Sequence, residues 1–307
     1  VRRTAPPPVP GPRALPVPTA MKLPSDSRSA RQLLRRIRDA RRGPRAVHHP
    51  HPGEAPGGVT LRVASYNVHK CVGRDGRFDP QRIAAVIGEM DADLVAIQEA
   101  DRRFGRRYGL LDAATLRRES GLHLLQVSDL PDGHGWHGNA ILLREGTPLR
   151  LHRLALPGAE PRGAVIAELD LPGGRLRVVA AHFGLLRNCR MRQGAAILRS
   201  IAEGASMPTL MMGDLNEWRP GRRSALRSLE PFFGPMNEGP ASFPTRMPVL
   251  SLDRILGWPN GLVHSVEAHD TALSRVASDH LPLKALLRLD LLDGAAEDAT
   301  PRLASVG

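Results

Sequence analysis

Four short segments of the chain each end a hydrophobic run with side chains that bind metals or phosphates. They read SYN at 65–67, IQE at 97–99, GDLN at 213–216 and SDH at 278–280. Such apolar runs are typical of buried strands, and loops at strand ends are where protein scaffolds carry catalytic groups. If the strands lie side by side, their ends supply oxygen ligands for a divalent cation and an imidazole for proton transfer. The residues concerned are Asn67, Glu99, Asp214, Asn216, Asp279 and His280.

The surrounding pattern predicts alternating strands and helices. Strands are predicted over 62–68, 93–99, 139–143, 164–171, 175–183, 209–216, 251–258 and 278–289. One helix is predicted to begin after Asp79 as N-cap, with Pro80 in its first position, and a second to cover 190–203. Apolar residues at helical spacing are Ile83, Val86, Ile87 and Met90 in the first and Met191, Leu198 and Ile201 in the second.

The ordered set of polar strand ends resembles the endonuclease/exonuclease/phosphatase superfamily over roughly 61–289. The matching stretches are RVASYNVHK, DLVAIQEAD, VVAAHFG, MMGDLNEW, LSLDRIL and ASDHLPL. Any one of them occurs often by chance, whereas the complete ordered set is specific. The resemblance implies an α/β fold, namely a four-layer α/β sandwich in which helices flank two central mixed β-sheets with their loop ends at one shared edge.

The same resemblance implies a role for each residue. Metal ligands would be Asn67, Glu99 and Asp279, and Mg²⁺, with Mn²⁺ as a substitute, suits such oxygen donors. Asp214 would orient or deprotonate the attacking water, His280 would face the phosphate, and Asp253 would hold His280. The catalytic residues are then His182, Asp214, Asn216, Asp253 and His280, and the phosphate-binding residues Asn67, His182, Asn216 and His280.

His182 resembles the second histidine of the family, but the residue that would hold it by a hydrogen bond differs from the family pattern. Deoxyribonuclease-like members place a glutamate there, but the corresponding stretch 136–139 has no acid, so we expect Asn139 to be the hydrogen-bond partner. Arg187, Arg190 and Arg192 follow the His182 strand. They form either a clamp for the substrate phosphate or the solvated start of a helix, and the sequence favours neither.

Composition limits the class of protein. The 307 residues are 41% hydrophobic, which is enough for a substantial core, and contain no run of about 18 apolar residues and no export signal. We therefore expect a soluble, cytoplasmic, monomeric catalytic domain. Cys71 and Cys189 are too few for a disulfide framework; both follow site motifs and could approach one another, but two free thiols are the favoured interpretation.

Charge is concentrated at the start of the chain. Residues 1–58 hold 12 of the 43 Lys/Arg and 3 of the 31 Asp/Glu, a formal charge of +9 that leaves +3 for the remainder. We expect a disordered Pro/Arg-rich tail over 1–58 with a short basic amphipathic helix at 27–42, a catalytic domain over 59–290 and a disordered tail over 291–307. The 27–42 segment is either a solvated, part-time helix, which is favoured, or a contact for an anionic membrane surface.

These observations predict metal-dependent hydrolysis of a phosphate ester by an activated water, as in a phosphodiesterase or phosphatase. The text NVHKCVGRDGRFDPQRI is similar to uncharacterised bacterial members associated with phospholipid metabolism, which favours a lipid or small phosphodiester. A DNA or RNA nuclease is the alternative. It is less favoured because the domain is nearly neutral and only 4% of the chain is aromatic. A catalytically inactive binding module is less favoured still, because no member of the constellation is missing.

Deletion of residues 1–58 should remove most of the positive charge of the chain without affecting catalysis. Every proposed ligand lies beyond this segment, so hydrolysis of a soluble phosphodiester should be unchanged. Binding to anionic vesicles should weaken, because each basic residue near such a surface contributes on the order of 1 kcal/mol. Vesicle co-sedimentation at low and physiological salt measures the effect. Unchanged binding at both salts would exclude a membrane role for the tail, and loss of hydrolysis would place the tail within the fold.

Overall fold

The computed structural model describes residues 60–102, 105–236 and 238–293. The predicted tail and its 27–42 helix lie outside these residues, and so does all of the predicted C-terminal tail except its first three residues. Those three belong to a short helix, α7 (Asp290–Asp293). None of the helices in the described part of the chain is long and apolar enough to cross a membrane.

Two mixed β-sheets form the centre of the domain. The first has the strand order β10-β11-β1-β2-β4-β3 and the second β5-β6-β7-β8-β9. The first contains β1 (Thr60–Asn67), β2 (Leu94–Gln98), β3 (His123–Leu124), β4 (Ala140–Leu143), β10 (Val263–Ala268) and β11 (Leu283–Arg288). The second contains β5 (Thr147–Leu156), β6 (Arg162–Leu171), β7 (Gly174–His182), β8 (Thr209–Asp214) and β9 (Asp253–Trp258). Within these sheets β1 and β2 are parallel, as are β7 and β8.

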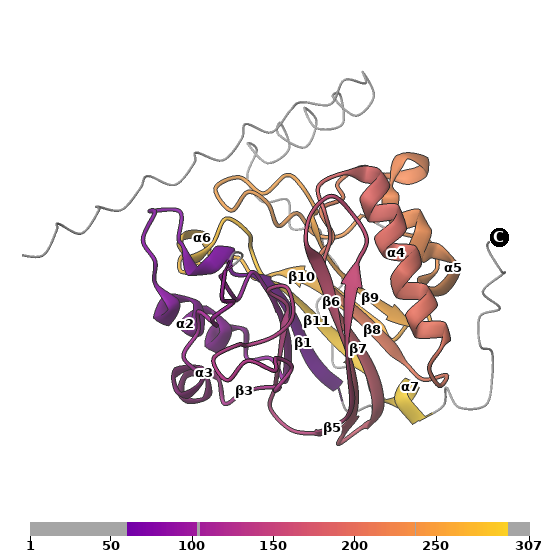
Figure 1. Ribbon diagram of the computed structural model, residues 1–307, viewed down its shortest axis with the longest axis horizontal. Helices are drawn as coiled ribbons and strands as arrows, with labels where there is room; N and C mark the ends of the chain where they lie inside the picture. The colour runs from indigo at the N-terminus through magenta and orange to yellow at the C-terminus, as the bar shows by residue number, and fades with distance from the viewer. Residues whose placement is uncertain (1–59, 103–104, 237, 294–307) are drawn as a thin grey trace, which may run out of the picture.

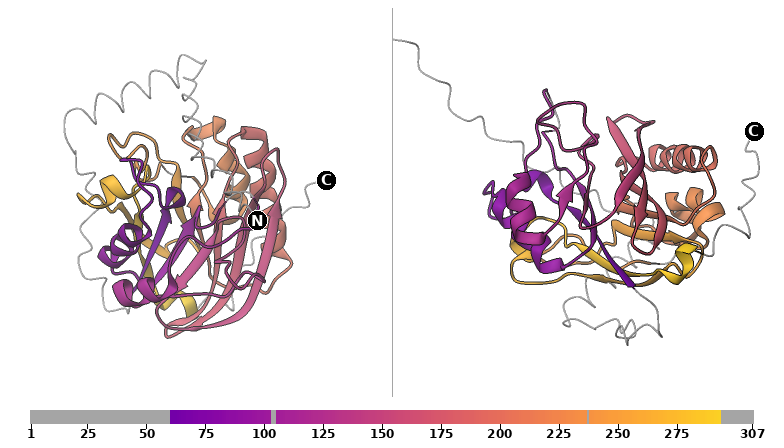
Figure 2. Two further views of the ribbon diagram at one scale, coloured as in Figure 1. Left: turned by 60° about the vertical axis from the view of Figure 1, so that its left-hand side comes forward. Right: turned by 90° about the horizontal axis from the view of Figure 1, so that it is seen from below.

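Helices cover the outer face of each sheet. Figures 1 and 2 show α2 (Pro80–Met90) and α3 (Ala113–Ser120) on one side of the paired sheets, with α4 (Arg187–Ala202) and α5 (Glu230–Phe233) on the other. The remaining short helices are η1 (His69–Cys71), η2 (Gly221–Arg223), η3 (Ala225–Leu229) and α6 (Ser274–Ala277). This arrangement confirms the four-layer α/β sandwich.

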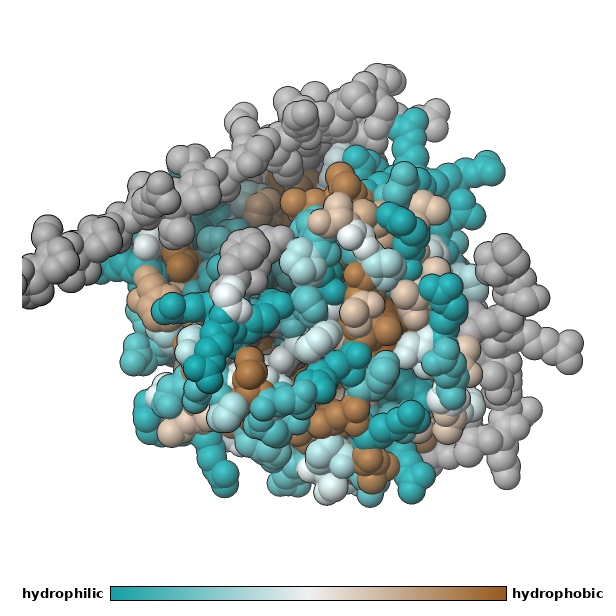
Figure 3. Space-filling model, viewed as in Figure 1, coloured by the Kyte–Doolittle hydropathy of each residue, from teal (hydrophilic) through white to brown (hydrophobic). Residues whose placement is uncertain are grey.

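Alternating side chains along the strands build three apolar layers. On β1, Val63 points into the core between the sheets, while Ala64 packs in the layer under α2 and α3. On β7, Val178 belongs to the inter-sheet core and Val179 to the layer beneath α4. Because strand side chains alternate between faces, each central strand must be apolar on both sides, which explains the continuous hydrophobic runs. Hydrophilic residues cover most of the face shown in Figure 3, with hydrophobic ones interspersed.

The predicted elements agree with the structure where the sequence pattern was strong. Helix α2 begins after Asp79, whose side chain accepts a hydrogen bond from the Arg82 backbone N–H, as predicted. Among the elements that the prediction missed are β5, which is exposed over most of its length, β10, in which no residue is fully buried, and α3, which buries Leu116 alone. Elements that bury so few apolar residues leave no clear period in the sequence. Met191, Leu198 and Ile201 all lie in α4 at helical spacing, as predicted; Leu198 and Ile201 are buried and Met191 is exposed. Both cysteines are buried free thiols.

Gly213 provides a test of the close approach between β7 and β8. Its φ is +150°, and a Cβ placed there would lie 1.8 Å from the carbonyl oxygen of Ala181 on the neighbouring strand. We expect Gly213→Ala to lower the free energy of unfolding by about 3 kcal/mol or more, because the backbone must move to relieve the clash. Gly221→Ala is the control: its φ is +57° but no atom lies within 4 Å, so about 1 kcal/mol is expected. Equal losses in urea denaturation would contradict the close approach.

Candidate active site

Strand register brings the polar strand ends to one edge of the sandwich. In the second sheet, Asp214 at the end of β8 pairs with His182 at the end of β7 and with Asp253 at the start of β9. In the first sheet, Asn67 at the end of β1 pairs with Gln98, the residue before Glu99. The β11 strand runs antiparallel to β1, so the segment leading into β11 delivers Asp279 and His280 to the same edge.

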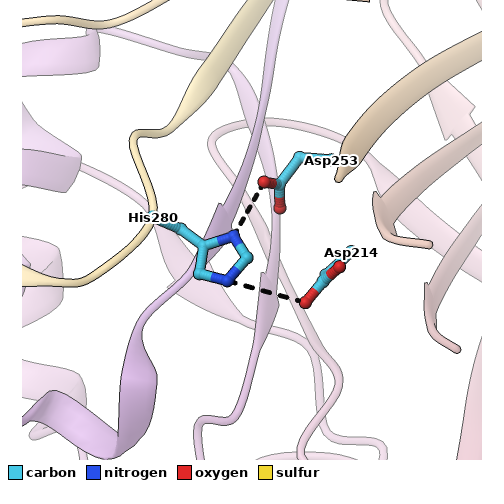
Figure 4. A group of neighbouring side chains, drawn as sticks. All are labelled: Asp214, Asp253 and His280. Atoms are coloured by element: carbon cyan, nitrogen blue, oxygen red, sulfur yellow. Dashed lines mark hydrogen bonds and ion pairs between the residues drawn. The ribbon is translucent and has the colours of Figure 1, made fainter. Parts of the chain in front are cut away.

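Asp214, Asp253 and His280 form a compact cluster at this edge (Figure 4). The His280 imidazole lies between two carboxylates, with Nδ1 2.8 Å from Asp253 Oδ2 and Nε2 3.8 Å from Asp214 Oδ2. The same Asp253 oxygen accepts a 2.5 Å hydrogen bond from the Ser242 hydroxyl. Asp253 therefore fixes the orientation of the ring through Nδ1 and leaves Nε2 directed toward Asp214.

Burial and the neighbouring charges together set the protonation of this cluster. Burial alone would lower the pKa of His280, but the carboxylates of Asp253 and Asp214 outweigh it and raise the pKa to about 10. Burial raises the pKa of Asp214 to about 6, with partial relief from the charge of His280. At neutral pH His280 is therefore cationic, while Asp214 is an anion with a pKa close to the working range of a general base.

Asn67 connects the two sheets through Asp214. Its Nδ2 donates to Asp214 Oδ2 at 3.0 Å, and its Oδ1 accepts from the His69 backbone N–H. Asn216, two residues after Asp214, has a left-handed backbone with φ of +53°. Its backbone N–H donates to Asp214 Oδ1 at 2.9 Å and its amide donates to the Phe183 carbonyl at 3.0 Å. The Asp214 carboxylate is thus held in a single orientation by groups from both sheets.

His182 has a partner that the sequence did not predict. The Nη1 of Arg162, at the start of β6, lies 3.0 Å from Nδ1 and 2.9 Å from Nε2 of the imidazole. Burial and the Arg162 charge hold the pKa of His182 well below its ordinary value, so the ring is neutral at pH 7. Its Nε2 lies 3.4 Å from Asp214 Oδ2. One ring nitrogen can therefore accept from Arg162 while the other donates toward Asp214.

Asn139 does not replace the missing glutamate, so that prediction was wrong. Its amide donates to the backbone carbonyls of Trp136 and Gly163, at 3.1 and 2.9 Å. The first bond lies within the β-bridge that backbone bonds form between Trp136 and Asn139, and the second ties this bridge to β6. The physical reason is local, since an amide at a strand start finds backbone acceptors before it can reach the next sheet.

Glu99 is the carboxylate best suited to hold a cation. It has a left-handed backbone, with φ of +59°, directly after β2. Burial alone would raise its pKa, but neighbouring positive groups at His182 and Lys70 outweigh burial and hold the pKa at about 2. Because His182 is itself neutral at pH 7, the positive charge that stabilises the Glu99 carboxylate at that pH is the Lys70 ammonium. The Lys70 ammonium contacts Glu99 Oε2 directly, so this carboxylate already binds a positive group and fits a divalent ion.

Asp279 lies beside His69, with Oδ2 3.8 Å from the ring Nε2. The preceding residue, Ser278, is buried and donates from its hydroxyl to the Asn67 carbonyl at 2.7 Å. This bond couples the loop before β11 to the end of β1. The three predicted metal ligands therefore have different neighbours. Asn67 donates to Asp214, Glu99 contacts the Lys70 ammonium, and Asp279 lies beside the His69 ring.

A second group of possible ligand atoms consists of Asp214, Asp253 and His280, which lie within 4.8 Å of one another in the described chain. This is the cluster of Figure 4, in which both ring nitrogens of His280 face carboxylates. A cationic imidazole has no lone pair for a metal, so the cluster is better suited to proton transfer and phosphate contact than to ligation.

The three arginines after the His182 strand have separate environments. Arg190 is 2% exposed and its guanidinium binds Glu217, with Nη2 3.1 Å from Oε2. Its Nη1 also donates to the carbonyls of Gly184 and Leu185. Arg187 donates to the Arg223 carbonyl, and Arg192 lies near the Cys189 sulfur. The arginines at the start of the helix are therefore not all solvated. Arg190 is buried, and its ion pair with Glu217 holds the loop after β8.

Sequence reasoning overlooked three residues at the site, namely Lys70, Arg162 and Ser242. Lys70 follows Asn67 by three residues, so its closeness to the site motif was a usable signal. Arg162 and Ser242 come from parts of the chain with no pattern of their own, and only the tertiary fold brings them to His182 and Asp253.

The comparisons with known proteins agree with this fold. Similar solved structures include an endonuclease/exonuclease/phosphatase from Beutenbergia cavernae DSM 12333, with 23% identity, a TM-score of 0.54, and 75% of this chain and 71% of that chain covered. One from Bacteroides vulgatus has 19% identity, a TM-score of 0.59, and coverage of 75% and 99%. The mannosyl-6-phosphatase of Bacteroides thetaiotaomicron VPI-5482 has 16% identity, a TM-score of 0.54, and coverage of 74% and 99%.

At these identities the solved structures show a shared fold. Among curated proteins, no relative matches the sequence. The model of the Endonuclease/Exonuclease/phosphatase family matches residues 64–280, which extend from β1 to His280 and include every residue placed at the site above. The chain therefore belongs to the endonuclease/exonuclease/phosphatase family.

Proposed function

We propose that this protein hydrolyses a phosphate ester by metal-assisted, in-line attack of a water molecule. The observation that carries the proposal is the line Asp253–His280–Asp214, in which a buried cationic imidazole stands 3.8 Å from a buried carboxylate whose pKa is about 6. A cation beside a base of this kind can bind an anionic ester while a water is deprotonated.

Asp214 takes the role of the base that orients and deprotonates the water. Its Oδ2 is fixed by Asn67 and its Oδ1 by the Asn216 backbone N–H, so the carboxylate is held in position before substrate binds. His280 takes the role of the phosphate-facing cation, since Asp253 keeps its charge and its tautomer fixed. Preorganised charge of this kind needs little rearrangement during the reaction.

Glu99 and Asn67 would hold Mg²⁺, with Mn²⁺ as a substitute and Asp279 as a further ligand in the proposed set. When bound, the ion supplies charge neutralisation at the phosphoryl oxygens. The fit rests on the ionised Glu99 carboxylate, which contacts an ammonium in this structure, and on the strand pairing that places Glu99 next to the end of β1. His182 is neutral, so it serves as a hydrogen-bond donor in the free enzyme and not as a ready general acid.

The substrate class we favour is a small or lipid phosphodiester or a phosphomonoester. The related fold of a mannosyl-6-phosphatase supports a small phosphate ester. A panel with Mg²⁺ and Mn²⁺ tests this: glycerophosphodiesters, sphingomyelin, inositol phosphates and sugar phosphates against duplex DNA, abasic DNA and RNA. Turnover confined to the nucleic acids would establish the nuclease alternative. No turnover of any ester with either ion would contradict the proposal.

Removal of the Glu99 charge should affect metal binding and turnover together. Glu99→Gln is expected to lower turnover by about 10²-fold or more, because it removes a strong electrostatic group while keeping the side-chain shape. Titration of Mg²⁺ by calorimetry should show the matching loss of affinity. Glu168→Gln, at a carboxylate that pairs with Arg177 on β7, is the control for removal of one negative charge. Undiminished hydrolysis in EDTA would exclude the metal.

Asp253 and His280 should behave as a unit. If the carboxylate acts by orienting the ring, Asp253→Asn and His280→Ala should each lower kcat strongly, and the double variant should be little worse than either single one. A double-mutant cycle on kcat, with thermal unfolding to verify folding, measures the coupling. Additive losses would show that Asp253 supports the fold independently of His280.

A further inference from the structure

Exposed hydrophobic side chains gather beside the catalytic edge, which is the edge of the sandwich where the strand ends of the site meet. The described part of the chain has nine large hydrophobic side chains that are exposed. Five of them belong to segments that adjoin this edge, namely Phe78, Leu185, Leu186, Met191 and Val276. Single exposed hydrophobic residues are ordinary, whereas neighbouring ones mark interaction surfaces.

The backbone that carries Leu185 and Leu186 is held in place, so their exposure is a property of the fold. The Leu185 N–H donates to Glu160 Oε1 at 2.8 Å, and the Leu185 carbonyl accepts from the buried Arg190 guanidinium at 2.5 Å. Leu185 is nevertheless 65% exposed and Leu186 57%. A partner that covers these two adjacent leucines gains the free energy that burial of their apolar area provides.

Exposed arginines lie beside these leucines. None of Arg187, Arg192 and Arg222 forms an ion pair with a carboxylate in the part of the chain that the structure describes. The Arg187 Nε donates to the Arg223 carbonyl at 3.0 Å, which brings η2 to the start of α4. Met191 lies one turn after Arg187 on the helix. We call the two leucines, Met191 and these three arginines the α4 patch, which is an apolar surface with positive charges around it.

A second surface of the same kind adjoins the first sheet. Phe78 lies in the segment between β1 and α2, and Val276 lies in α6, shortly before Asp279. The two segments are in contact, because the Arg74 N–H donates to the Val276 carbonyl at 2.9 Å. Arg74 and Arg77 are exposed, as are Phe78 and Val276. Exposed apolar and cationic side chains therefore flank the catalytic edge on both sheets.

We propose that the catalytic edge docks on a membrane surface that carries anionic phospholipids. Leu185 and Leu186 enter the apolar boundary of the bilayer, while the arginines of the α4 patch contact the lipid phosphates. A nucleic acid fits this surface less well, because leucine and methionine offer no stacking face for bases. Residues 1–58 are a poor occupant, since their formal charge is +9 and the patch is itself positive. The docking goes beyond the proposed hydrolysis and does not depend on it.

Co-sedimentation of the full-length protein with vesicles of phosphatidylcholine and phosphatidylglycerol tests the docking without turnover. Leu185→Ser/Leu186→Ser should lower the affinity about tenfold or more at physiological salt, because both apolar anchors are lost. The matched control is Leu149→Ser/Leu151→Ser, which removes two exposed leucines from the end of β5 remote from the catalytic edge. Equal losses in the two double variants, or no loss in either, would overturn the proposal.

The arginines are tested by the salt dependence of the same binding. Arg192→Gln/Arg222→Gln should weaken it several-fold at low salt and little at high salt, because salt screens their attraction to the lipid phosphates. Arg117→Gln/Arg118→Gln, at exposed positions of α3, is the control for loss of two positive charges. The same loss in both pairs would mean that net charge, and not the α4 patch, binds the vesicles.

A fluorescent probe locates the contact within the chain. Both native cysteines are buried, so an environment-sensitive label on Leu186→Cys reports on the α4 patch. Its emission should shift to the blue with the anionic vesicles, whereas the label on the control Leu151→Cys should not respond. No shift at Leu186→Cys, or the same shift at both positions, would contradict the docking. A shift that appears only with duplex DNA, or with rising protein concentration and no vesicles, would identify another occupant and equally reject it.

Discussion

The burial of the Asp214 carboxylate is the constraint on which the site depends. The side chain is 3% exposed, and an isolated charge at such a position would be strongly destabilising. It is tolerated because partners arrive from several elements: Asn67 from β1, His280 from the loop before β11, and the Asn216 backbone from its own loop. The two sheets must therefore be joined in one relative position for the carboxylate to remain ionised. Because the buried Asp214 carboxylate needs partners from both sheets, the packing of the sandwich and the assembly of the site depend on one another.

Two histidines beside this carboxylate illustrate how position decides protonation. His280 lies between Asp253 and Asp214 and has a raised pKa, whereas His182 lies against the Arg162 guanidinium and has a lowered one. Both imidazoles are almost fully buried, so burial acts on them in the same direction. The difference comes from the charge of the nearest partner. His280 is thus cationic at neutral pH and His182 is neutral, and the positive charge beside His182 is that of the Arg162 guanidinium.

Much of this arrangement could be predicted from the sequence, because strand ends and their polar residues are local features. The IQE and GDLN segments each indicate a buried strand and the polar side chains at its end. The parallel pairing of β1 with β2 and of β7 with β8 then determines where those side chains lie. Asn139 shows the limit of this reasoning. The resemblance suggested a contact with His182, because Asn139 lies in the stretch that corresponds to the family's supporting glutamate, but its amide bonds the Trp136 and Gly163 carbonyls instead. Arg162 could not be predicted, since its role depends on the contact between β6 and β7 and not on any local pattern.

Lys70 connects the electrostatics of the site with its geometry. The residue lies in η1, where His69, Lys70 and Cys71 all have left-handed backbone angles. Such angles cost energy in residues other than glycine, so the surrounding contacts must hold them. Two of these contacts are visible: the Asn67 side chain accepts from the His69 backbone N–H, and the Cys71 side chain is buried under α2. The strained turn directs the ammonium onto Glu99. The residue that anchors the turn, Asn67, also binds Asp214, so the local backbone strain, the cation at Glu99 and the orientation of the catalytic carboxylate depend on the same amide.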